Sequence, residues 1–412
     1  MFKRVPGTKD ILPEESCLWQ ALEMKARNIF SLYNYQEIRT PIIEESSLFN
    51  RTLGITTEIV QKQMFLLSNQ KNTYALRPEG TTSVVRSYLE NNLDKGNGFV
   101  KLYYIGPMFR LERPQKGRLR QFHHIGCEVI GSSDPALDAE VISLAKELLN
   151  DFGITGYKIK INSLGCQKDK ETLSLKLKER LQRKSKELCC ACRLRIKNNV
   201  LRVLDCKNVI CRKIVKDIYT SGEYLCPECL QHFNKVRNEL ISLDIAFDIS
   251  PLLVRGLDYY NRTVFEISHP ELGSQDALGA GGRYSNLVRE LGGADSEGIG
   301  FAFGLERLLL VKNNLKQKSQ RKLVYLINLG DTAKSIGLKI LSQLRAKGIT
   351  CDTDYLNKSL KAAMRAANDA GASTVLILGE DELKKNIISV KDMSTGRQKE
   401  IPLENLSEEL KC

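Results

Sequence analysis

The chain has 412 residues, more than one hydrophobic core usually organises, and this length indicates about two to three domains. Its 42% hydrophobic and 27% charged residues exclude an intrinsically disordered protein, and its net charge of +13 favours a negatively charged partner. Residues 1–10 do not have the pattern of a secretory signal, and no apolar run is long enough to cross a bilayer. We therefore expect a cytoplasmic protein without a membrane segment.

The first predicted element is a helix that begins at Pro13 and ends near Asn34. Acidic residues in its first turn and apolar residues at helical spacing give it a start and one buried face. In residues 35–49, Pro41 indicates a strand interrupted at the edge of a sheet, because proline lacks the N–H group that a sheet ladder needs. Residues 74–86 then predict a short strand, a turn and a helix. Glu79 lies on this turn, where it could bind a ligand cation or cap the helix.

Residues 103–131 predict two antiparallel strands joined by a polar loop. Guanidinium groups bind phosphate oxygens bidentately and keep their charge, so this loop is a candidate polyphosphate site. A solvated basic surface is the alternative. The loop contains five cations and one acid: Arg110, Arg113, Lys116, Arg118 and Arg120, with Glu112.

The next elements lead into an unusually basic segment. Asp134 and Pro135 predict the cap and first turn of a helix, and residues 157–161 alternate as a strand. Residues 168–216 contain sixteen Lys and Arg and five acidic residues, an excess of eleven positive charges. A localised basic surface is typical of proteins that bind nucleic acid, with solvated lysine-rich helices as the alternative. Mainly helical patterns here predict an insertion with its own small fold.

Seven of the twelve cysteines lie in residues 189–229, and we expect reduced thiols because no secretory signal is present. Four of them form two C-x-x-C pairs and two more lie between the pairs: Cys189 and Cys192, Cys226 and Cys229, and Cys206 with Cys211. The two pairs could supply one tetrahedral zinc site, but the gap between them is longer than in a zinc ribbon. Reduced structural thiols are the preferred interpretation, and no metal ligand is predicted.

Strands with regularly placed glycines are predicted at residues 253–267, 277–288 and 298–311. Glycine permits close approach of the backbone to a ligand. Apolar residues from position 299 to position 309 are predicted to share one helical face, and Arg307 can project from another side of the helix toward a site.

A polar, lysine-rich connection at residues 313–322 predicts a domain boundary. Strand-like and helix-like runs alternate after it, which is typical of a small parallel α/β domain. This domain contains neither a GxGxxG motif nor a P-loop lysine, so we do not expect a nucleotide site in it.

Six of these stretches, in this order, resemble the motifs of the histidyl-tRNA synthetases, which are class II aminoacyl-tRNA synthetases. They are RTPIIEESSLF (motif 1), LRPEGT, MFRLERPQKGRLRQFH (motif 2), LVRGLDYYNRTVFE (the histidine-specific stretch), GAGGRYSNLV and GIGFAFGLERLLL (motif 3). The resemblance implies an α+β catalytic core on a mainly antiparallel sheet with flanking helices, a helical insertion and a C-terminal α/β anticodon-binding domain.

This resemblance predicts four segments. The catalytic core occupies residues 1–165, with motifs 1 and 2, and residues 249–318, with the histidine-specific stretch and motif 3. The basic, cysteine-rich insertion occupies residues 166–248, and the anticodon-binding domain residues 322–412.

The implied reaction is attack of the histidine carboxylate on the α-phosphate of ATP, which gives histidyl-adenylate and diphosphate. Histidine is then transferred to the 3′ end of histidine tRNA. Mg²⁺ is expected only as part of the ATP substrate complex, and no tightly bound organic cofactor is expected. The resemblance also implies a homodimer formed through motif 1, and the insertion is expected to contact the tRNA.

The resemblance also assigns residues to ATP and to catalysis. Arg110 is implied at the α-phosphate, Arg307 near the γ-phosphate, and Arg255 at both the α-phosphate and the histidine carboxylate. These three arginines are the expected catalytic residues. The other implied ATP contacts are the adenine amine, the adenine ring and the outer phosphates, made by Glu112, Phe122 and Arg118.

For histidine, the resemblance implies that Glu79 and Thr81 hold the ammonium group and that Glu128 and Tyr260 bind the imidazole. A site of buried polar partners rejects a substrate that leaves them unpaired by about 10⁴ to 10⁵, so no hydrolytic editing is expected. The complete implied histidine set is Glu79, Gly80, Thr81, Arg110, His124, Glu128, Tyr259, Tyr260 and Tyr284.

His124 departs from the family, in which this position is commonly glutamine. An imidazole accepts a hydrogen bond only when neutral, and only at one nitrogen. We therefore expect His124 to be a neutral acceptor and histidine affinity to fall below pH about 6.5, the unperturbed imidazole pKa.

The alternative functions are a non-catalytic regulatory subunit of ATP phosphoribosyltransferase and a tRNA-binding sensor. The regulatory class resembles the catalytic core but typically lacks the anticodon domain and the arginine of the histidine-specific stretch. Arg255 and residues 322–412 are both present, which favours the synthetase.

Overall fold

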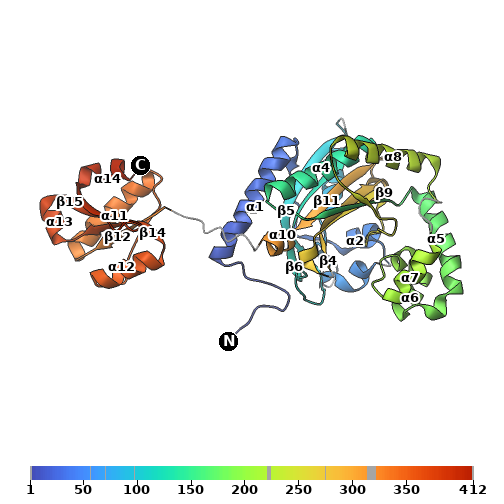
Figure 1. Cartoon of the computed structure of the whole chain (residues 1–412), viewed down its shortest axis with the longest axis horizontal. Helices are drawn as coiled ribbons and strands as arrows, with labels where there is room; N and C mark the ends of the chain where they lie inside the picture. The colour runs from blue at the N-terminus through green and yellow to red at the C-terminus, as the bar shows by residue number, and fades with distance from the viewer. Residues whose placement is uncertain are drawn as a thin grey trace. The chain divides into compact units, whose positions relative to one another are not determined.

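The computed structural model describes residues 2–55, 57–69, 71–96, 98–219, 224–273, 275–312 and 322–410. The chain forms two compact units, Met1–Leu315 and Lys316–Cys412 (Figure 1). The predicted connection at residues 313–322 lies outside the described residues apart from Lys322. In the part of the chain that the structure describes, no helix has the length and apolar character needed to span a membrane.

The first unit is built on an eight-stranded sheet. Its outermost pairs, β1 with β5 and β7 with β8, are parallel, and all pairs between them are antiparallel. The predicted mainly antiparallel α+β core is therefore confirmed. The strand order is β1 (Gln36–Glu37), β5 (Val100–Phe109), β6 (Gln121–Ile130), β11 (Gly298–Gly304), β10 (Ala277–Tyr284), β9 (Asn261–Ser268), β7 (Lys158–Ser163) and β8 (Asp248–Ile249).

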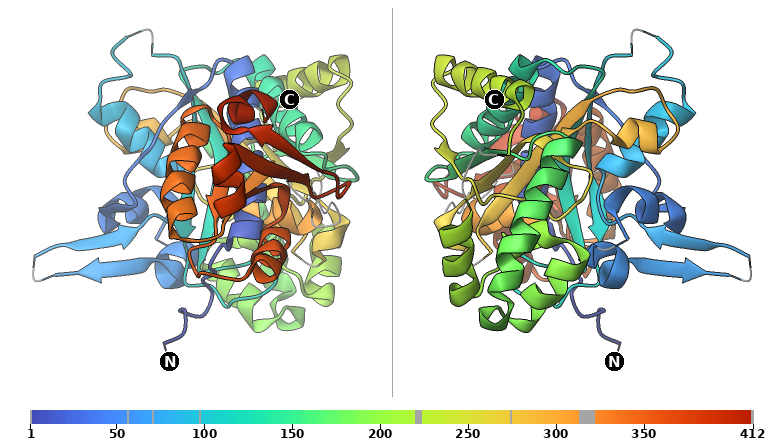
Figure 2. Two further views of the ribbon diagram at one scale, coloured as in Figure 1. Left: turned by 90° about the vertical axis from the view of Figure 1, so that its left-hand side faces the viewer. Right: turned by 90° about the vertical axis from the view of Figure 1, so that its right-hand side faces the viewer.

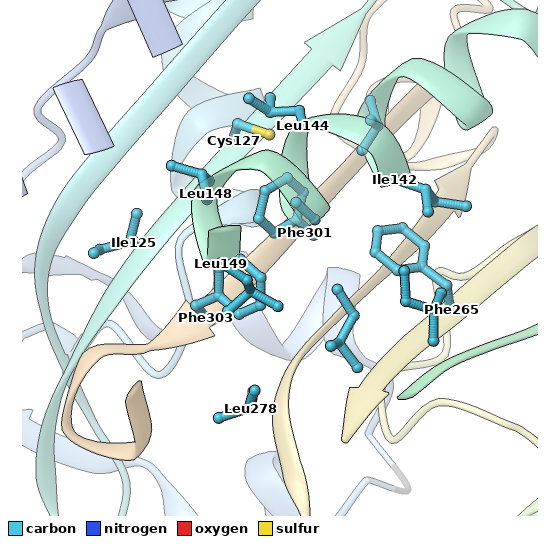
Figure 3. Close-up of a cluster of buried hydrophobic side chains, with 14 of the residues drawn as sticks. Ile125, Cys127, Ile142, Leu144, Leu148, Leu149, Phe265, Leu278, Phe301 and Phe303 are labelled. Atoms are coloured by element: carbon cyan, nitrogen blue, oxygen red, sulfur yellow. The ribbon is translucent and has the colours of Figure 1, made fainter. Parts of the chain in front are cut away.

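Helices cover one face of this sheet. Strand alternation sends every second residue of β6 and β11 to this face, where they meet apolar residues spaced along α4. Figure 3 shows Leu144 and Leu148 of α4 near Cys127 and Phe301 of the sheet. Asp134 fixes the start of α4 as predicted, because its carboxylate accepts the N–H of Ala136 at 2.9 Å. The covering helices are α1 (Pro13–Leu32), α4 (Pro135–Asp151) and α8 (Pro227–Ser242).

The opposite face, which we call the glycine-rich face, is formed by the alternate residues of the same strands. Its β11 positions are all small, and a Cβ atom at Gly300 would lie 2.0 Å from Oε2 of Glu128. The Glu128 carboxylate thus lies directly against the backbone of β11, an approach that only glycine permits at this position. The face carries Phe122, His124 and Glu128 of β6 and Gly298, Gly300, Ala302 and Gly304 of β11.

A three-stranded sheet and short helices flank this core. Pro41 separates β1 from β2, which belong to different sheets, so the predicted interruption is confirmed. The β3–β4 hairpin extends away from the rest of its unit (Figure 2). These elements are β2 (Ile43–Glu45), β4 (Thr73–Leu76) and β3 (Phe65–Ser68), with α2 (Ser46–Leu53), α3 (Thr81–Glu90) and α9 (Leu287–Glu290).

Motif 3 differs from its prediction. Residues 298–304 form β11, and only α10 (Leu305–Lys312) is helical, so the predicted helical face starting at position 299 is wrong. Ile299 faces the core, whereas Ala302 lies on the glycine-rich face. The reason is pairing on both sides: β11 bonds to β6 and β10, and its apolar residues alternate with period two.

The insertion contains α5 (Gln167–Arg183), α6 (Cys190–Asn198) and α7 (Val209–Ile218) around its own apolar cluster. Helix α8 follows them, but its Phe233, Val236 and Leu240 pack in the core of the catalytic sheet. The division at residues 165 and 248 stays a prediction.

The second unit has a five-stranded sheet in the order β13-β12-β14-β15-β16. The first three strands are parallel, but β15 and β16 are antiparallel, so the predicted wholly parallel sheet is wrong there. Residues 379–386, between β14 and β15, are too few for a parallel crossover, and Asn386 reverses the chain with a φ of 52°. The elements are β12 (Leu323–Asn328), α11 (Asp331–Ala346), β13 (Cys351–Thr353), α12 (Leu360–Asp369), β14 (Ala372–Leu378), α13 (Glu380–Lys385), β15 (Ile387–Asp392) and β16 (Gln398–Pro402).

Candidate active site

Glu128 lies at the centre of the glycine-rich face and is 1% exposed. Its carboxylate accepts hydrogen bonds from Thr81 Oγ1 at 2.6 Å, Tyr284 OH at 2.9 Å and Tyr104 OH at 3.3 Å. Burial raises the pKa of Glu128 to about 8, although the three hydroxyl groups oppose this shift. Burial thus disfavours ionisation of the Glu128 carboxyl group. Buried carboxyl groups with strongly shifted pKa values are typical of functional sites.

Glu79 caps helix α3. Its carboxylate accepts the backbone N–H groups of Thr81 at 2.7 Å and Thr82 at 2.9 Å, and the hydroxyl of Tyr259 lies 3.5 Å away. The adjacent Gly80 has no room for a side chain, because a Cβ atom would lie 2.4 Å from the Tyr104 ring. Of the two alternatives for Glu79, the cap is therefore present, and the buried carboxylate also lies beside the tyrosines.

Three tyrosines line the same region. The rings of Tyr259 and Tyr260 are 4.6 Å apart, and those of Tyr259 and Tyr284 are 5.9 Å apart. The loop that carries the first two is held by Lys170 of α5, whose ammonium group donates to the carbonyl oxygens of Asp258 and Tyr260 at 2.9 Å each. The insertion thus positions one wall of the site.

The predicted phosphate-binding residues meet at the loop of the β5–β6 hairpin. Arg110 donates to the Pro78 carbonyl at 2.9 Å, and its guanidinium carbon lies 5.3 Å from the centre of the Phe122 ring. Arg118 pairs with Glu112 at 3.2 Å. Arg307 projects from α10 and donates through Nε to the Gly117 carbonyl at 2.9 Å.

These guanidinium groups lie close enough to affect one another. Burial lowers the pKa of Arg307, and the charges of Arg118 and Arg110 lower it further, while Glu112 opposes them. Arg307 donates to the carbonyl oxygens of Gly117, Gln275 and Ala277. Gathering like charges is unfavourable without an anion, so this side of the face suits a polyphosphate.

Arg255 lies beside Tyr260 and Glu266. Its guanidinium lies 5.9 Å from the centre of the Tyr260 ring, and Nη1 pairs with Glu266 of β9 at 3.4 Å. Its Nε is buried without a hydrogen-bond partner among the described residues. Because buried donors are normally satisfied, this nitrogen indicates that a ligand completes the site.

His124 lies on β6 next to Phe122, with their ring centres 5.1 Å apart. Burial, followed by the positive charge of Arg110, lowers the pKa of His124 to about 3. The imidazole is therefore neutral, as expected, and its pKa lies too low for its protonation to reduce histidine affinity near pH 6.5. The unperturbed pKa does not apply to a desolvated ring beside guanidinium groups.

We accordingly expect the His124 ring to stay neutral from about pH 8 down to about pH 5. In this range the KM for histidine should depend on pH in the same way in the wild type and in His124→Gln. Histidine labelling and NMR can follow the ring directly, because the chain contains only 4 histidines. A His124 resonance that titrates near its ordinary value would contradict the structure.

Several important residues were missed from the sequence. Tyr104 could have been found from strand parity, because it lies opposite Gly126, between His124 and Glu128 on the neighbouring strand. Arg77 is buried and donates to the carbonyl oxygens of Thr40 and Pro107, and only the tertiary structure reveals this tie.

One sequence interpretation is not supported by the geometry. The two C-x-x-C pairs do not converge on one zinc site. Cys189 and Cys192 lie with Cys206 and Cys211, whereas Cys226 and Cys229 lie with two other residues, Cys166 and Asp169.

Comparisons with known proteins identify the family of this chain. The family model for histidyl-tRNA synthetase matches residues 7–192 and 212–308, and the model for an anticodon binding domain matches residues 323–412. The chain belongs to the histidyl-tRNA synthetase family. Ligation of histidine to tRNA with ATP, predicted from the sequence, is therefore confirmed as the activity of this family member.

Individual relatives support the same conclusion over the whole synthetase. A histidine–tRNA ligase of Halothermothrix orenii is 47% identical over 408 residues, 98% of this chain and 97% of that protein. One from Desulfitobacterium hafniense is 44% identical over 99% of this chain and 97% of that protein. The apo histidyl-tRNA synthetase of S. aureus has a TM-score of 0.82 at 35% identity, with 100% of both chains covered.

A Bacillus halodurans structure described as an ATP phosphoribosyltransferase regulatory subunit/histidyl-tRNA synthetase shares the fold. Its TM-score is 0.66 at 23% identity, and it covers 92% of this chain and 98% of that chain. The regulatory alternative is thus less supported than the synthetase.

Proposed function

We propose that the glycine-rich face is where histidyl-adenylate forms, with ATP on the arginine side and histidine on the side of Glu128. The observation that carries this proposal is a buried carboxylate surrounded by three hydroxyl donors, on the same strand face as an aromatic ring under a guanidinium group. A buried carboxylate suits an imidazole N–H, and a ring beside guanidinium groups suits adenine next to its phosphates.

On the histidine side, Glu128 and Tyr260 bind the imidazole, and Glu79 with Thr81 binds the ammonium group. His124 accepts a hydrogen bond from the ammonium group through a neutral nitrogen, which its low pKa supports. The pocket walls are Gly80, Tyr259 and Tyr284, and their burial supports a shape-selective site.

On the ATP side, Phe122 stacks on adenine and Glu112 accepts its exocyclic amine. Arg110 binds the α-phosphate, Arg118 the outer phosphates and Arg307 the γ-phosphate. Glu112 and Arg118 are paired at 3.2 Å, so ATP would exchange this ion pair for one contact to each partner. That exchange couples adenine recognition to phosphate binding.

In the reaction, a histidine carboxylate oxygen bonds to the α-phosphorus as the bond to diphosphate breaks. The two reactants are both anions, so the protein must first offset their repulsion. Arg255 contacts both, and Arg110 offsets the charge that develops on the α-phosphate. The unsatisfied Nε of Arg255 supports this role, because the ligand supplies its missing acceptor. Mg²⁺ enters with ATP, bound by phosphate oxygens and water.

The remaining partners follow from the surface. The basic segment at residues 168–216 is the proposed tRNA contact of the insertion, because its excess of eleven positive charges suits a phosphate backbone.

The proposed homodimer uses motif 1. Ile42 is 40% exposed and Ile43 51% exposed, and a second copy of the chain would cover this apolar surface. We propose a cytoplasmic location for this enzyme.

The test is histidine-dependent exchange of labelled diphosphate into ATP. We expect exchange with histidine and none with the other amino acids. Exchange with a different amino acid would correct the substrate, and no exchange with any amino acid would favour the regulatory subunit.

A further inference from the structure

The cysteines of the insertion converge in two groups that take no part in the proposed binding of histidine or ATP. Within each group, the potential ligand atoms all lie within 4.8 Å of one another. The cysteines of these two groups form no disulfides, so disulfides do not account for the convergence. The groups are Cys189, Cys192, Cys206 and Cys211, called the four-cysteine group, and Cys166, Asp169, Cys226 and Cys229, called the aspartate group.

The four-cysteine group has the spacing of a structural metal site. Two residues separate Cys189 from Cys192 and four separate Cys206 from Cys211, both within the range of tetrahedral zinc sites. The thiols come from the start of α6, from the residues after the 3₁₀ turn Val200–Val203, and from α7. Three separate pieces of the small fold therefore meet at these four sulfur atoms.

The distances also fit a metal. Four thiolates at about 2.3 Å from one ion form a tetrahedron with edges of roughly 3.8 Å. The Sγ atoms of Cys189 and Cys206 are 3.9 Å apart. The backbone N–H of Cys189 lies 3.3 Å from Sγ of Cys211, a hydrogen bond that supports negative charge on the sulfur.

The aspartate group has a similar arrangement at the start of α5 and α8. The Asp169 carboxylate accepts the backbone N–H of Cys166 at 3.2 Å and of Cys226 at 3.1 Å. The N–H of Cys166 also lies 3.2 Å from Sγ of Cys229. Backbone donors are thus directed at the potential anionic ligands in this group too, which is an independent observation from the first site.

We propose that each group binds one structural Zn²⁺ ion. A tetrahedral sulfur-rich set selects zinc over magnesium or calcium, which prefer oxygen ligands. Each filled site carries a net charge of about −2, which the surrounding Lys and Arg residues offset. The part of the insertion that packs around its own apolar cluster is small, with α5 to α7 occupying residues 167–218, a size at which a bound metal commonly stabilises a fold. Packing of neutral thiols alone does not require two such four-ligand groups.

One residue, Lys170, connects the aspartate group to the active site. Asp169 is followed by Lys170, which holds the carbonyl oxygens of Asp258 and Tyr260. Zinc on the aspartate group fixes the start of α5 and therefore the position of Lys170. Loss of this ion should raise the KM for histidine more than loss of the ion on the four-cysteine group.

Elemental analysis of the full chain, purified under reducing conditions without chelator, tests the proposal. We expect two zinc ions per chain, one on each group. The double variants Cys206→Ser/Cys211→Ser and Cys226→Ser/Cys229→Ser should each retain one. The matched control is Cys190→Ser, because Cys190 is exposed and adjacent to Cys189 but belongs to neither group.

A Co²⁺ titration of metal-free wild-type chain gives a second readout that does not depend on the folding of a variant. We expect thiolate-to-cobalt absorption that saturates at two ions per chain and is reversed by Zn²⁺. Saturation at one ion would remove one of the two sites, and the double variant that loses this ion would identify the group that binds it. No zinc as purified together with no thiolate absorption would overturn both sites, as would iron in place of zinc or equal metal loss in Cys190→Ser. Metal content is independent of catalysis, so failure of this proposal is distinct from failure of the proposed catalytic roles.

Discussion

Replacement of Arg255 by alanine is expected to reduce the turnover number for histidine-dependent diphosphate exchange by about 10² to 10³. The KM for ATP should change by only a few-fold, because the other arginines still bind the phosphates. An interaction made mainly in the transition state lowers turnover without weakening ground-state binding. Steady-state exchange kinetics at several ATP concentrations separate the two parameters.

Two further variants separate catalysis from simple loss of positive charge or of structure. Arg289→Ala is the matched control, because Arg289 is 59% exposed and pairs on the surface with Asp295 at 3.7 Å. It should retain wild-type exchange. Arg255→Lys keeps a charge near Glu266 but loses the planar pair of donors, so it should recover only part of the rate. Turnover of Arg255→Ala within about threefold of wild type would remove Arg255 from the mechanism.

Replacement of Glu128 by glutamine is expected to lower kcat/KM for histidine by about 10- to 100-fold. At about pH 9, where Glu128 is ionised, a hydrogen bond to this charged group contributes about 1.5–3 kcal/mol, and the amide keeps the shape of the carboxyl group without its charge. The KM for ATP should be unchanged, because Glu128 lies on the histidine side. Unaltered kcat/KM for histidine would show that the carboxylate does not bind the substrate.

The same substitution should stabilise the unliganded protein at alkaline pH. The pKa of Glu128 in the folded protein is raised to about 8. The stability that the protonated group contributes is therefore fully present below its pKa in the unfolded chain, and it is lost as the pH rises through about 8. Glutamine has no charge to bury. Glu128→Gln should therefore melt at a higher temperature than wild type at about pH 9, and the two proteins should differ little at about pH 5.

Fluorescence of Trp19 suits this measurement, because it is the only tryptophan and lies on α1, which packs on the catalytic sheet. Tyr284→Phe is a useful comparison, since it removes one hydroxyl donor to Glu128 but keeps the carboxylate. It should not show the stabilisation at alkaline pH. Equal melting temperatures of wild type and Glu128→Gln at both pH values would contradict the raised pKa.

Much of the fold could be predicted because local patterns and tertiary packing agree. The β5–β6 hairpin, the cap at Asp134 and the first helix all appear where turn residues and apolar spacing place them. The helical prediction for motif 3 was wrong because its apolar residues fit both the helical and the strand period over a short stretch. Pairing of β11 with two neighbouring strands decided for the strand.

The sequence by itself determined the family, the order of the motifs and the residue types of the site, since these depend on short stretches of chain. Tertiary structure alone decided the state of those residues. It buried His124 beside Arg110 and so set its pKa far below the ordinary value. It also divided the cysteines into two groups that linear spacing did not reveal. Both outcomes depend on residues distant along the chain, because desolvation and ligand convergence are properties of three-dimensional neighbours.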